Sequence, residues 1–341
     1  MRFVRSLMPA VLLGATCVAC VAITAAPTTV ASAQPACTPT AQSPSPSGKV
    51  TRLSGPDRDS TSVAVSMATF ETPGSAGGAV LASDANYPDA LAGTPLAVLK
   101  HSPLLLTTPG GLSSVVANEI SRVAPKGSTV YILGGDAALA PDVDSQVQAL
   151  GDVPQRIAGS DRFATAVAIA GVMGDPTNIL EATGVNFPDA LSAGAAAAGE
   201  GGAVLLTNGS VQASETAAYL SLHTGDNRTA VGGPAASADP TASPLVGSDR
   251  YATSVDVAER FTSNPIRMGF ASGVSFPDAL SGGSAIGLNK DPMVLVPACG
   301  PLPTSVSGYL STVHSSVVAG SLYGGTLAVG DDVLTELDAA L

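Results

Sequence analysis

Short apolar segments alternate with longer stretches of helical character along most of this 341-residue chain. The apolar segments lack the regular alternation of a half-exposed strand, which is typical of parallel strands covered on both faces. The pattern therefore predicts an α/β fold with parallel sheets, of the Rossmann-like kind. Predicted strands include residues 79–82, 103–106, 130–133, 203–206, 230–231, 268–271, 292–295 and 322–323.

One hexapeptide occurs three times, always between a predicted strand and a predicted helix. Its copies are Tyr87-Pro88-Asp89-Ala90-Leu91-Ala92, Phe187-Pro188-Asp189-Ala190-Leu191-Ser192 and Phe276-Pro277-Asp278-Ala279-Leu280-Ser281. An Asp-Arg motif that opens a helix and a Gly-Gly pair that closes the last strand also occur three times each. The units are too long for a solenoid repeat. The sequence therefore predicts three tandem modules, at residues 52–151, 152–243 and 244–341.

The N-terminal segment has the features of an export signal. Arg2 and Arg5 precede an apolar stretch over about residues 7–25, and small residues at 31–33 offer a cleavage site. We expect residues 1–33 to be a signal peptide, residues 34–51 to be a Pro/Ser/Thr-rich linker, and the mature protein to be secreted. No later apolar stretch is long enough to span a bilayer, so we expect no integral membrane segment after signal removal.

Composition restricts the partners and the packing. The chain has 15 Lys and Arg against 27 Asp and Glu, and loss of Arg2 and Arg5 with the signal gives a net charge of −14. Such a charge argues against nucleic acid as a partner. Aromatic residues are 4% of the chain and Trp is absent, so we expect cores of Ala, Val and Leu in which helices approach closely.

Removal of the signal leaves two cysteines, Cys37 and Cys299. Export makes a disulfide between them feasible. Two unpaired thiols or an intermolecular bond are the alternatives, because sequence gives no distance between the two residues. The chain that remains has no CxxC spacing that would indicate a metal site, and no cofactor is predicted.

All the repeated motifs follow strands and should therefore lie at the carboxyl edge of their sheets, where α/β folds bind ligands. Each candidate residue has a structural and a ligand-binding interpretation. The hexapeptide Asp residues suit helix N-caps, whereas the helix start could bind an anion and the aromatic residue could stack on a sugar. The Arg residues suit salt bridges or anion clamps. The candidates are Asp57, Arg58, Tyr87, Asp89, Asp161, Arg162, Phe187, Asp189, Asp249, Arg250, Phe276 and Asp278.

The sequence gives little support for a catalytic function. It contains no GxSxG, HExxH or P-loop pattern, and the glycine pairs lack the GxGxxG spacing of dinucleotide-binding folds. His101, His223 and His314 stand at unrelated positions of the repeats. No catalytic residue is predicted, and the Rossmann-like pattern does not imply a nucleotide.

The order Gly-Ser-Asp-Arg, then aromatic-Pro-Asp-Ala-Leu, then an apolar strand and a Gly-Gly turn, three times over residues 52–341, resembles the cell wall binding repeat 2 family of Gram-positive bacteria. The resemblance implies three Rossmann-like modules about a pseudo-threefold axis. It also implies noncovalent binding of an exported, nonenzymatic protein to the cell wall, through an anionic secondary polymer or peptidoglycan. Alternatives are a wall hydrolase of the amidase type and a surface-layer or adhesive protein. The sequence does not indicate the oligomeric state.

The three repeats are not identical. Asp59 stands where the other repeats have Phe163 and Tyr251. Pro244 stands where the others have Arg52 and Arg156. We therefore expect that a site built from these positions differs among the three modules.

Overall fold

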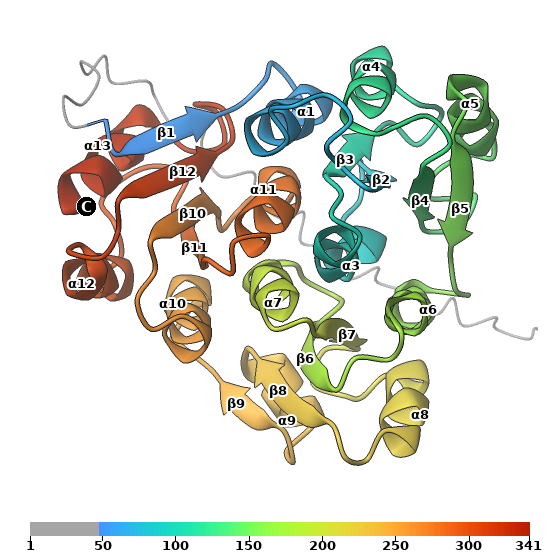
Figure 1. Ribbon diagram of the computed structural model, residues 1–341. Coiled ribbons are helices and arrows are strands. Elements are labelled where there is room, and N and C mark those ends of the chain that lie inside the picture. The colour runs from blue at the N-terminus through green and yellow to red at the C-terminus, as the bar shows by residue number, and fades with distance from the viewer. Residues whose placement is uncertain (1–47) are drawn as a thin grey trace, which may run out of the picture. The chain divides into compact units, whose positions relative to one another are not determined.

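The computed structural model describes residues 48–341 and contains three four-stranded sheets, each fully parallel (Figure 1). The predicted α/β class and the three Rossmann-like modules are confirmed. The predicted signal peptide and the linker up to residue 47 lie outside the described residues, so both stay predictions.

The first sheet has the strand order β3-β2-β4-β5. Its strands are β2 (Gly78–Ser83), β3 (Leu104–Thr107), β4 (Thr129–Leu133) and β5 (Val153–Ile157). The surrounding helices are α1 (Arg58–Thr69), α2 (Pro88–Leu91), α3 (Gly93–Leu99), α4 (Ser114–Val123) and α5 (Asp142–Leu150). The helix expected after the hexapeptide is divided into α2 and α3. Pro95 accounts for the break, because a proline ring conflicts with the carbonyl four residues earlier, at Leu91.

The second sheet has the equivalent order β7-β6-β8-β9, and the third has β11-β10-β12-β1. The strands are β6 (Asn178–Thr183), β7 (Ala203–Thr207), β8 (Asn227–Val231), β9 (Ser243–Leu245), β10 (Arg267–Ser272), β11 (Met293–Val296), β12 (Ala319–Tyr323) and β1 (Val50–Leu53). The helices are α6 (Arg162–Met173), α7 (Pro188–Gly199), α8 (Ser214–Leu222), α9 (Gly233–Ala238), α10 (Arg250–Phe261), α11 (Pro277–Gly287), α12 (Thr304–Val313) and α13 (Asp331–Ala340).

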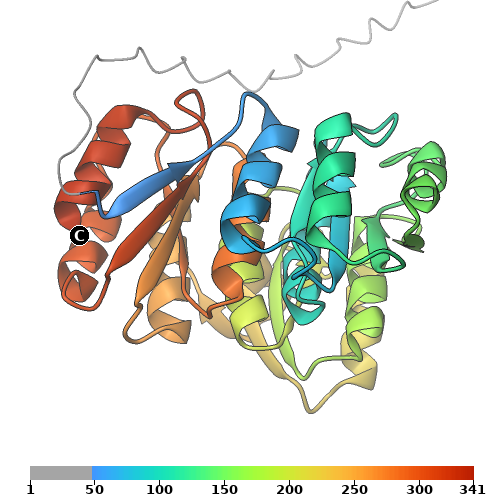
Figure 2. The ribbon, with the colours of Figure 1, turned by 45° about the horizontal axis from the view of Figure 1, so that its top comes forward.

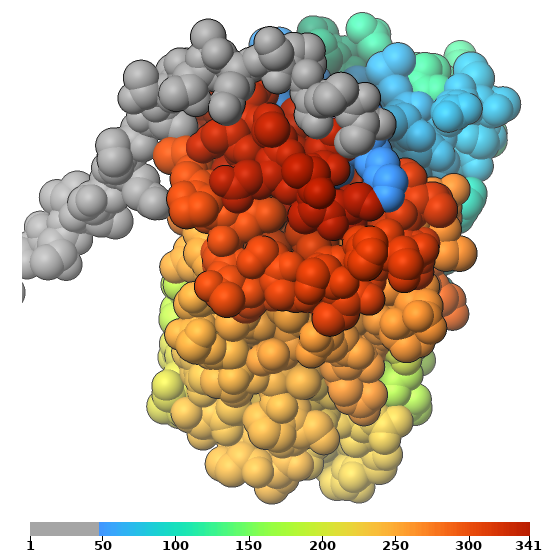
Figure 3. Space-filling model, turned by 90° about the vertical axis from the view of Figure 1, so that its left-hand side faces the viewer, coloured from blue at the N-terminus to red at the C-terminus, as the bar shows by residue number. Residues whose placement is uncertain are grey.

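The first strand of each repeat belongs to the sheet of the preceding repeat. Strand β5 pairs with β4, and β9 pairs with β8. The ring closes at β1, which begins within the segment expected to be linker and pairs with β12 of the last module. The space-filling view shows the blue of this first strand directly against the red of the C-terminal segment (Figure 3). Each sheet therefore contains three strands from one sequence repeat and one strand from the next repeat around the ring.

Helices α3, α7 and α11 contact one another and form the centre of the three-module arrangement (Figures 1 and 2). Small residues allow this close approach: a Cβ atom on Gly287 would lie 2.9 Å from that of Ala198. The central core draws buried side chains from all three modules. Successive residues of β2 face opposite sides of the sheet. Val80 faces the shared core, and Leu81 faces the module's own outer core. This two-sided burial explains the uninterrupted apolar runs in the sequence.

Cys299 is disulfide-bonded, and its partner lies outside the described residues. Its pairing with Cys37 therefore stays a prediction, because Cys37 also lies outside them. Within residues 48–341, none of the helices has the length and apolar character needed to span a bilayer.

Candidate ligand-binding junctions between the modules

The Asp of each Asp-Arg motif caps the helix that follows. Asp57 accepts a hydrogen bond from the Ser60 N–H at 2.7 Å. Asp161 and Asp249 each accept from two backbone N–H groups, at 2.8 to 2.9 Å. Capping satisfies N–H groups that have no partner within the helix. These three residues are therefore the N-caps of α1, α6 and α10.

The Arg of each motif points back to the turn after the central strand of its module. Nη1 of Arg58, Arg162 and Arg250 donates to the carbonyl oxygen of Asp84, Gly184 and Gly273, at 2.7, 2.6 and 2.5 Å. Within residues 48–341, these guanidinium groups form none of the salt bridges found at 4.0 Å or less. The salt-bridge interpretation is therefore wrong at this distance. The Asp-Arg turn and the hexapeptide turn lie at the same edge of the sheet, as expected.

The hexapeptide Asp residues are not N-caps, which corrects the structural interpretation. The N-cap positions are held by Tyr87, Phe187 and Phe276, without a side-chain cap. Pro occupies the next position, so the Asp falls within the first helical turn. Its carboxylate fills the space beside the first glycine of the Gly-Gly turn, and a Cβ on Gly134, Gly232 or Gly324 would meet Asp89, Asp189 or Asp278. These glycines also have positive φ, which disfavours other residues.

Each of these carboxyl groups lies near the Arg of the next module; Asp89 and Asp189 are half-buried, and Asp278 is buried. Burial raises the pKa of Asp89, and a hydrogen bond with Thr165 and the Arg162 charge oppose that rise. Burial likewise raises the pKa of Asp189, opposed by Arg250. We call Asp89, Asp189 and Asp278 the junction carboxylates, and Arg162, Arg250 and Arg58 the junction arginines.

The third pair closes the ring. Burial raises the pKa of Asp278 to about 6, and the Arg58 charge opposes the rise. Asp278 belongs to the last module and Arg58 to the first. The pairs thus define three related junctions, between modules 1 and 2, modules 2 and 3, and modules 3 and 1.

The three hexapeptide aromatics pack against one another instead of lining separate sites. The rings of Tyr87, Phe187 and Phe276 lie 5.4 to 6.0 Å apart between centroids, and all three are half-buried. Tyr87 Oη also donates to the Val185 carbonyl at 3.2 Å. Edge-on and tilted ring pairs at this spacing are stabilising. The cluster brings the carboxyl edges of the three sheets together.

A cleft of about 520 Å³ opens at the junction of modules 1 and 2. Asp89 lines it from module 1, and Asp161, Arg162 and Thr165 line it from module 2. Its volume falls within the range of small-molecule sites. Of the sequence-predicted residues, the structure thus brings Asp89, Asp161 and Arg162 into one space.

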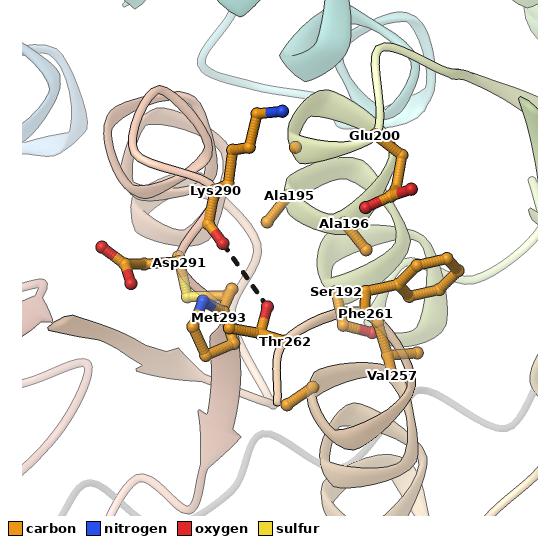
Figure 4. A pocket seen from close by; sticks show the side chains of 13 residues that line it. Ser192, Ala195, Ala196, Glu200, Val257, Phe261, Thr262, Lys290, Asp291 and Met293 are labelled. Atoms are coloured by element: carbon orange, nitrogen blue, oxygen red, sulfur yellow. Dashed lines mark hydrogen bonds between the residues drawn. The ribbon is translucent and has the colours of Figure 1, made fainter. Parts of the chain in front are cut away.

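A second hollow lies at the opposite edge of the sheets, between the ends of α7 and α10 (Figure 4). Phe261 and Met293 line it, and Thr262 Oγ1 donates to the Lys290 carbonyl at 3.4 Å across it. It holds about 20 Å³, which is roughly the space of one water molecule. It is too small for a sugar unit, whereas a neighbouring hollow of about 440 Å³, lined by Arg228 and Arg260, is not.

Sequence reasoning missed two sets of residues that shape the junctions. Oγ1 of Thr61, Thr165 and Thr253 accepts from the backbone N–H of Gly55, Gly159 and Gly247 at 3.0 to 3.2 Å, which fixes each Asp-Arg turn. The signal was present, because this Thr follows the Gly by six residues in every repeat.

The second missed set comprises Arg156 and Arg52, which hold the Gly-Gly loops. Arg156 Nη1 donates to the carbonyls of Gly134 and Leu139, both at 2.9 Å, and Nη2 pairs with Asp144. Arg52 Nη1 donates to Gly324 O at 2.7 Å. Pro244 occupies this position beside the Gly-Gly loop of module 2, where α9 begins directly at the Gly-Gly pair.

The geometry offers binding groups more plainly than reacting ones. Within the part of the chain that the structure describes, no group of three or more His, Cys, Asp or Glu side chains is arranged to hold a metal ion. The three histidines are apart from the junctions. His223 stacks on Tyr219 with centroids 4.0 Å apart, and His101 packs edge-on against Phe70.

Three known proteins are similar to this chain. The chain is 28% identical over 252 residues to the N-acetylmuramoyl-L-alanine amidase LytC of Bacillus subtilis, covering 72% of this chain and 50% of LytC. Cwp8 from Clostridium difficile is similar in structure, with a TM-score of 0.76 and 25% identity, over 86% of this chain and 51% of Cwp8. Cwp6 from the same organism gives 0.75 and 21%, over 85% and 48%. The chain thus spans about half the length of these relatives.

A family model for cell wall binding domain 2 (CWB2) matches three times, over residues 52–144, 156–241 and 245–334. These matches coincide with the three repeats and cover most of the chain. The chain therefore belongs to the CWB2 family of cell wall binding proteins.

Proposed function

We propose that this protein is exported and attaches noncovalently to the cell wall by binding an anionic secondary polymer at the junctions between its modules. The observation that carries the proposal is that, at each junction, an arginine lies near a carboxyl group from the neighbouring module. Arginine N–H groups suit the phosphate and carboxylate groups of a polymer. One hydrogen bond to a backbone carbonyl holds each junction arginine in place. The carboxylate can accept hydrogen bonds from sugar hydroxyl groups.

The acidic net charge is compatible with this proposal because recognition is local. The cleft between modules 1 and 2 places Arg162 within reach of a ligand, while most acidic side chains lie elsewhere on the chain. Screening at physiological salt limits repulsion to about 8 Å. Weak binding at several junctions along one repeating polymer can raise the overall affinity by about 10² to 10⁴.

The test is a sedimentation assay with purified walls of a Gram-positive bacterium, before and after chemical removal of their anionic polymers. We expect binding to intact walls and a large loss of binding to stripped walls. Equal binding to both would exclude the polymer and favour peptidoglycan as the ligand. The N-terminal residue of the exported protein, measured by mass spectrometry, tests cleavage after Ala33.

A wall hydrolase is the second candidate, favoured by the similarity to an amidase. We propose that the described modules bind and do not transform wall material. Zymography on peptidoglycan with the full chain tests this proposal. A lysis zone produced by the pure protein would overturn it.

A further inference from the structure

The three junctions differ at two positions beside the junction arginine. The residue after the arginine is Phe163 in module 2, Tyr251 in module 3 and Asp59 in module 1. The residue whose carbonyl accepts the arginine hydrogen bond is Gly184, Gly273 and Asp84 in the same order. Module 1 thus carries two aspartates where the other modules carry an aromatic residue and a glycine.

In modules 2 and 3 the two positions are matched sterically. A Cβ on Gly184 would lie 3.0 Å from the Phe163 ring, and a Cβ on Gly273 would lie 2.7 Å from the Tyr251 ring. The aromatic ring therefore needs glycine at the turn. The paired replacement in module 1 removes the ring and the glycine together, so it changes the charge of the junction without leaving a clash.

The two aspartates flank the arginine of the junction between modules 3 and 1. Asp59 is 6% exposed and Asp84 is half-buried. Burial raises the pKa of Asp59, an effect that the Ser113 hydroxyl opposes and that the neighbouring Asp84 charge reinforces. Burial also raises the pKa of Asp84, opposed first by the charge of Arg58. Arg58 lies within electrostatic reach of both carboxyl groups.

More carboxyl groups lie near Arg58 than near Arg162 or Arg250, although Arg58 is the more exposed residue. Besides Asp59 and Asp84, it lies near Asp57 and Asp278, and its guanidinium carbon is 5.5 Å from the centre of the Phe276 ring. At the junction of modules 1 and 2, two carboxylates, Asp89 and Asp161, surround Arg162. Asp136 on the nearby Gly-Gly loop is 73% exposed and lies 3.9 Å from Arg156.

We propose that the anionic groups of the wall polymer bind at the junctions of modules 1 and 2 and of modules 2 and 3, and that Asp59 and Asp84 exclude them from the third junction. This inference rests on the proposed function. Two added carboxyl groups repel an incoming phosphate or carboxylate and compete with it for Arg58. The polymer then follows one part of the junction edge, and the cleft of about 520 Å³ beside Arg162 is one of its two contacts.

Single arginine variants of the full chain test the ranking on intact walls. We expect Arg162→Ala and Arg250→Ala each to weaken binding by about 10- to 100-fold, as loss of charge-assisted hydrogen bonds does. Arg58→Ala should change binding by less than about threefold, because little anion binds there. Each variant is first compared with the unaltered chain by thermal unfolding. Equal losses for Arg58→Ala and Arg162→Ala in folded proteins would overturn the inference.

The exclusion itself is tested by Asp59→Asn with Asp84→Asn, which keeps side-chain volume and removes both charges. We expect this double variant to bind intact walls at least about fivefold more tightly, and adding Arg58→Ala should abolish the gain. Asp59→Phe with Asp84→Gly, which copies module 2, provides an independent route to the same gain. No gain in either folded variant would overturn the inference. Failure of the proposed function looks different, because the unaltered chain would then bind intact and stripped walls equally.

Discussion

Glu181 is a buried acid in the central strand of module 2, and its replacement should change how stability depends on pH. It is fully buried, and Leu81 and Phe270 occupy the equivalent positions in β2 and β10. Its Oε2 accepts a hydrogen bond from Gln212 at 2.6 Å. Burial raises its pKa to about 7, against the opposing Gln212 hydrogen bond, and nearby Asp239 adds to the rise.

The magnitude follows from the difference between this pKa and the ordinary glutamate value of 4.5. That difference corresponds to about 3 kcal/mol. Because the folded-state pKa is the higher one, the folded protein binds the extra proton. The contribution of Glu181 to stability is therefore fully present below about pH 4.5 and is lost as the pH rises through about 7. Glu181→Gln resembles the protonated acid at every pH and should not show this loss.

The assay is denaturant unfolding at pH 5 and pH 8, followed by circular dichroism. We expect Glu181→Gln and the unaltered chain to differ little at pH 5, and the variant to be more stable by about 3 kcal/mol at pH 8. Glu71→Gln is the control, because it removes an equal charge from an exposed position. A variant that shows the same loss between pH 5 and pH 8 as the unaltered chain would refute the reasoning.

Three further predictions concern stability. Gly324→Ala should lower the unfolding free energy by about 3 kcal/mol, because φ is +114° and the new Cβ would lie 2.5 Å from Asp278 Oδ2. Thermal unfolding checks this, with Gly325→Ala as the control, because a Cβ there would meet no atom within 4 Å. Arg122→Ala should lower the unfolding free energy by about 3 kcal/mol, because it leaves Glu119, whose side chain is 2% exposed, without its ion-pair partner at 2.7 Å. The exposed Arg260→Ala is the control, and equal unfolding midpoints for the two variants would contradict the prediction. Nonreducing peptide mapping should recover Cys37 joined to Cys299, and reduction should lower the unfolding free energy by about 4 kcal/mol; recovery of Cys299 joined to another residue would disprove the pairing.

Much of the fold could be predicted because each level of the sequence pointed the same way. The apolar runs, the hexapeptide turns and the threefold repetition all indicated parallel α/β modules. The strand exchange could not be predicted in this way. Strands such as β5 and β9 are short and partly exposed, so their sequences do not specify which sheet edge they join. Their pairing is set by the packing of whole modules.

The hexapeptide Asp shows why the site was harder to predict than the fold. An Asp at a helix start suits an N-cap, and sequence alone offers no reason against it. The competing interaction is with a glycine more than forty residues later, where the missing Cβ makes room for the carboxylate. Glu181 was also not singled out in the sequence, where it stands between Leu180 and Ala182. Its burial is what makes it informative.

The exchanged strands explain why each junction contains residues from two modules. Strand β5 completes the first sheet, and the Gly134 N–H donates to its last residue, Ile157, at 2.9 Å. The chain then leaves that sheet at its carboxyl edge and begins α6, which places Arg162 of the second module beside Asp89 of the first. Strand β9 does the same for Arg250 and Asp189.

The third junction depends on β1, since Gly324 N–H donates to Leu53 O at 3.0 Å only when the first strand lies against the last sheet. An isolated repeat would therefore hold an arginine and a carboxylate that belong to different sites. It follows that three repeats form three junctions because the ring closes; an open chain of three would form two. The junction that closure adds is also the one that carries Asp59 and Asp84, so in this chain ring closure adds a contact between modules without adding an equivalent anion site.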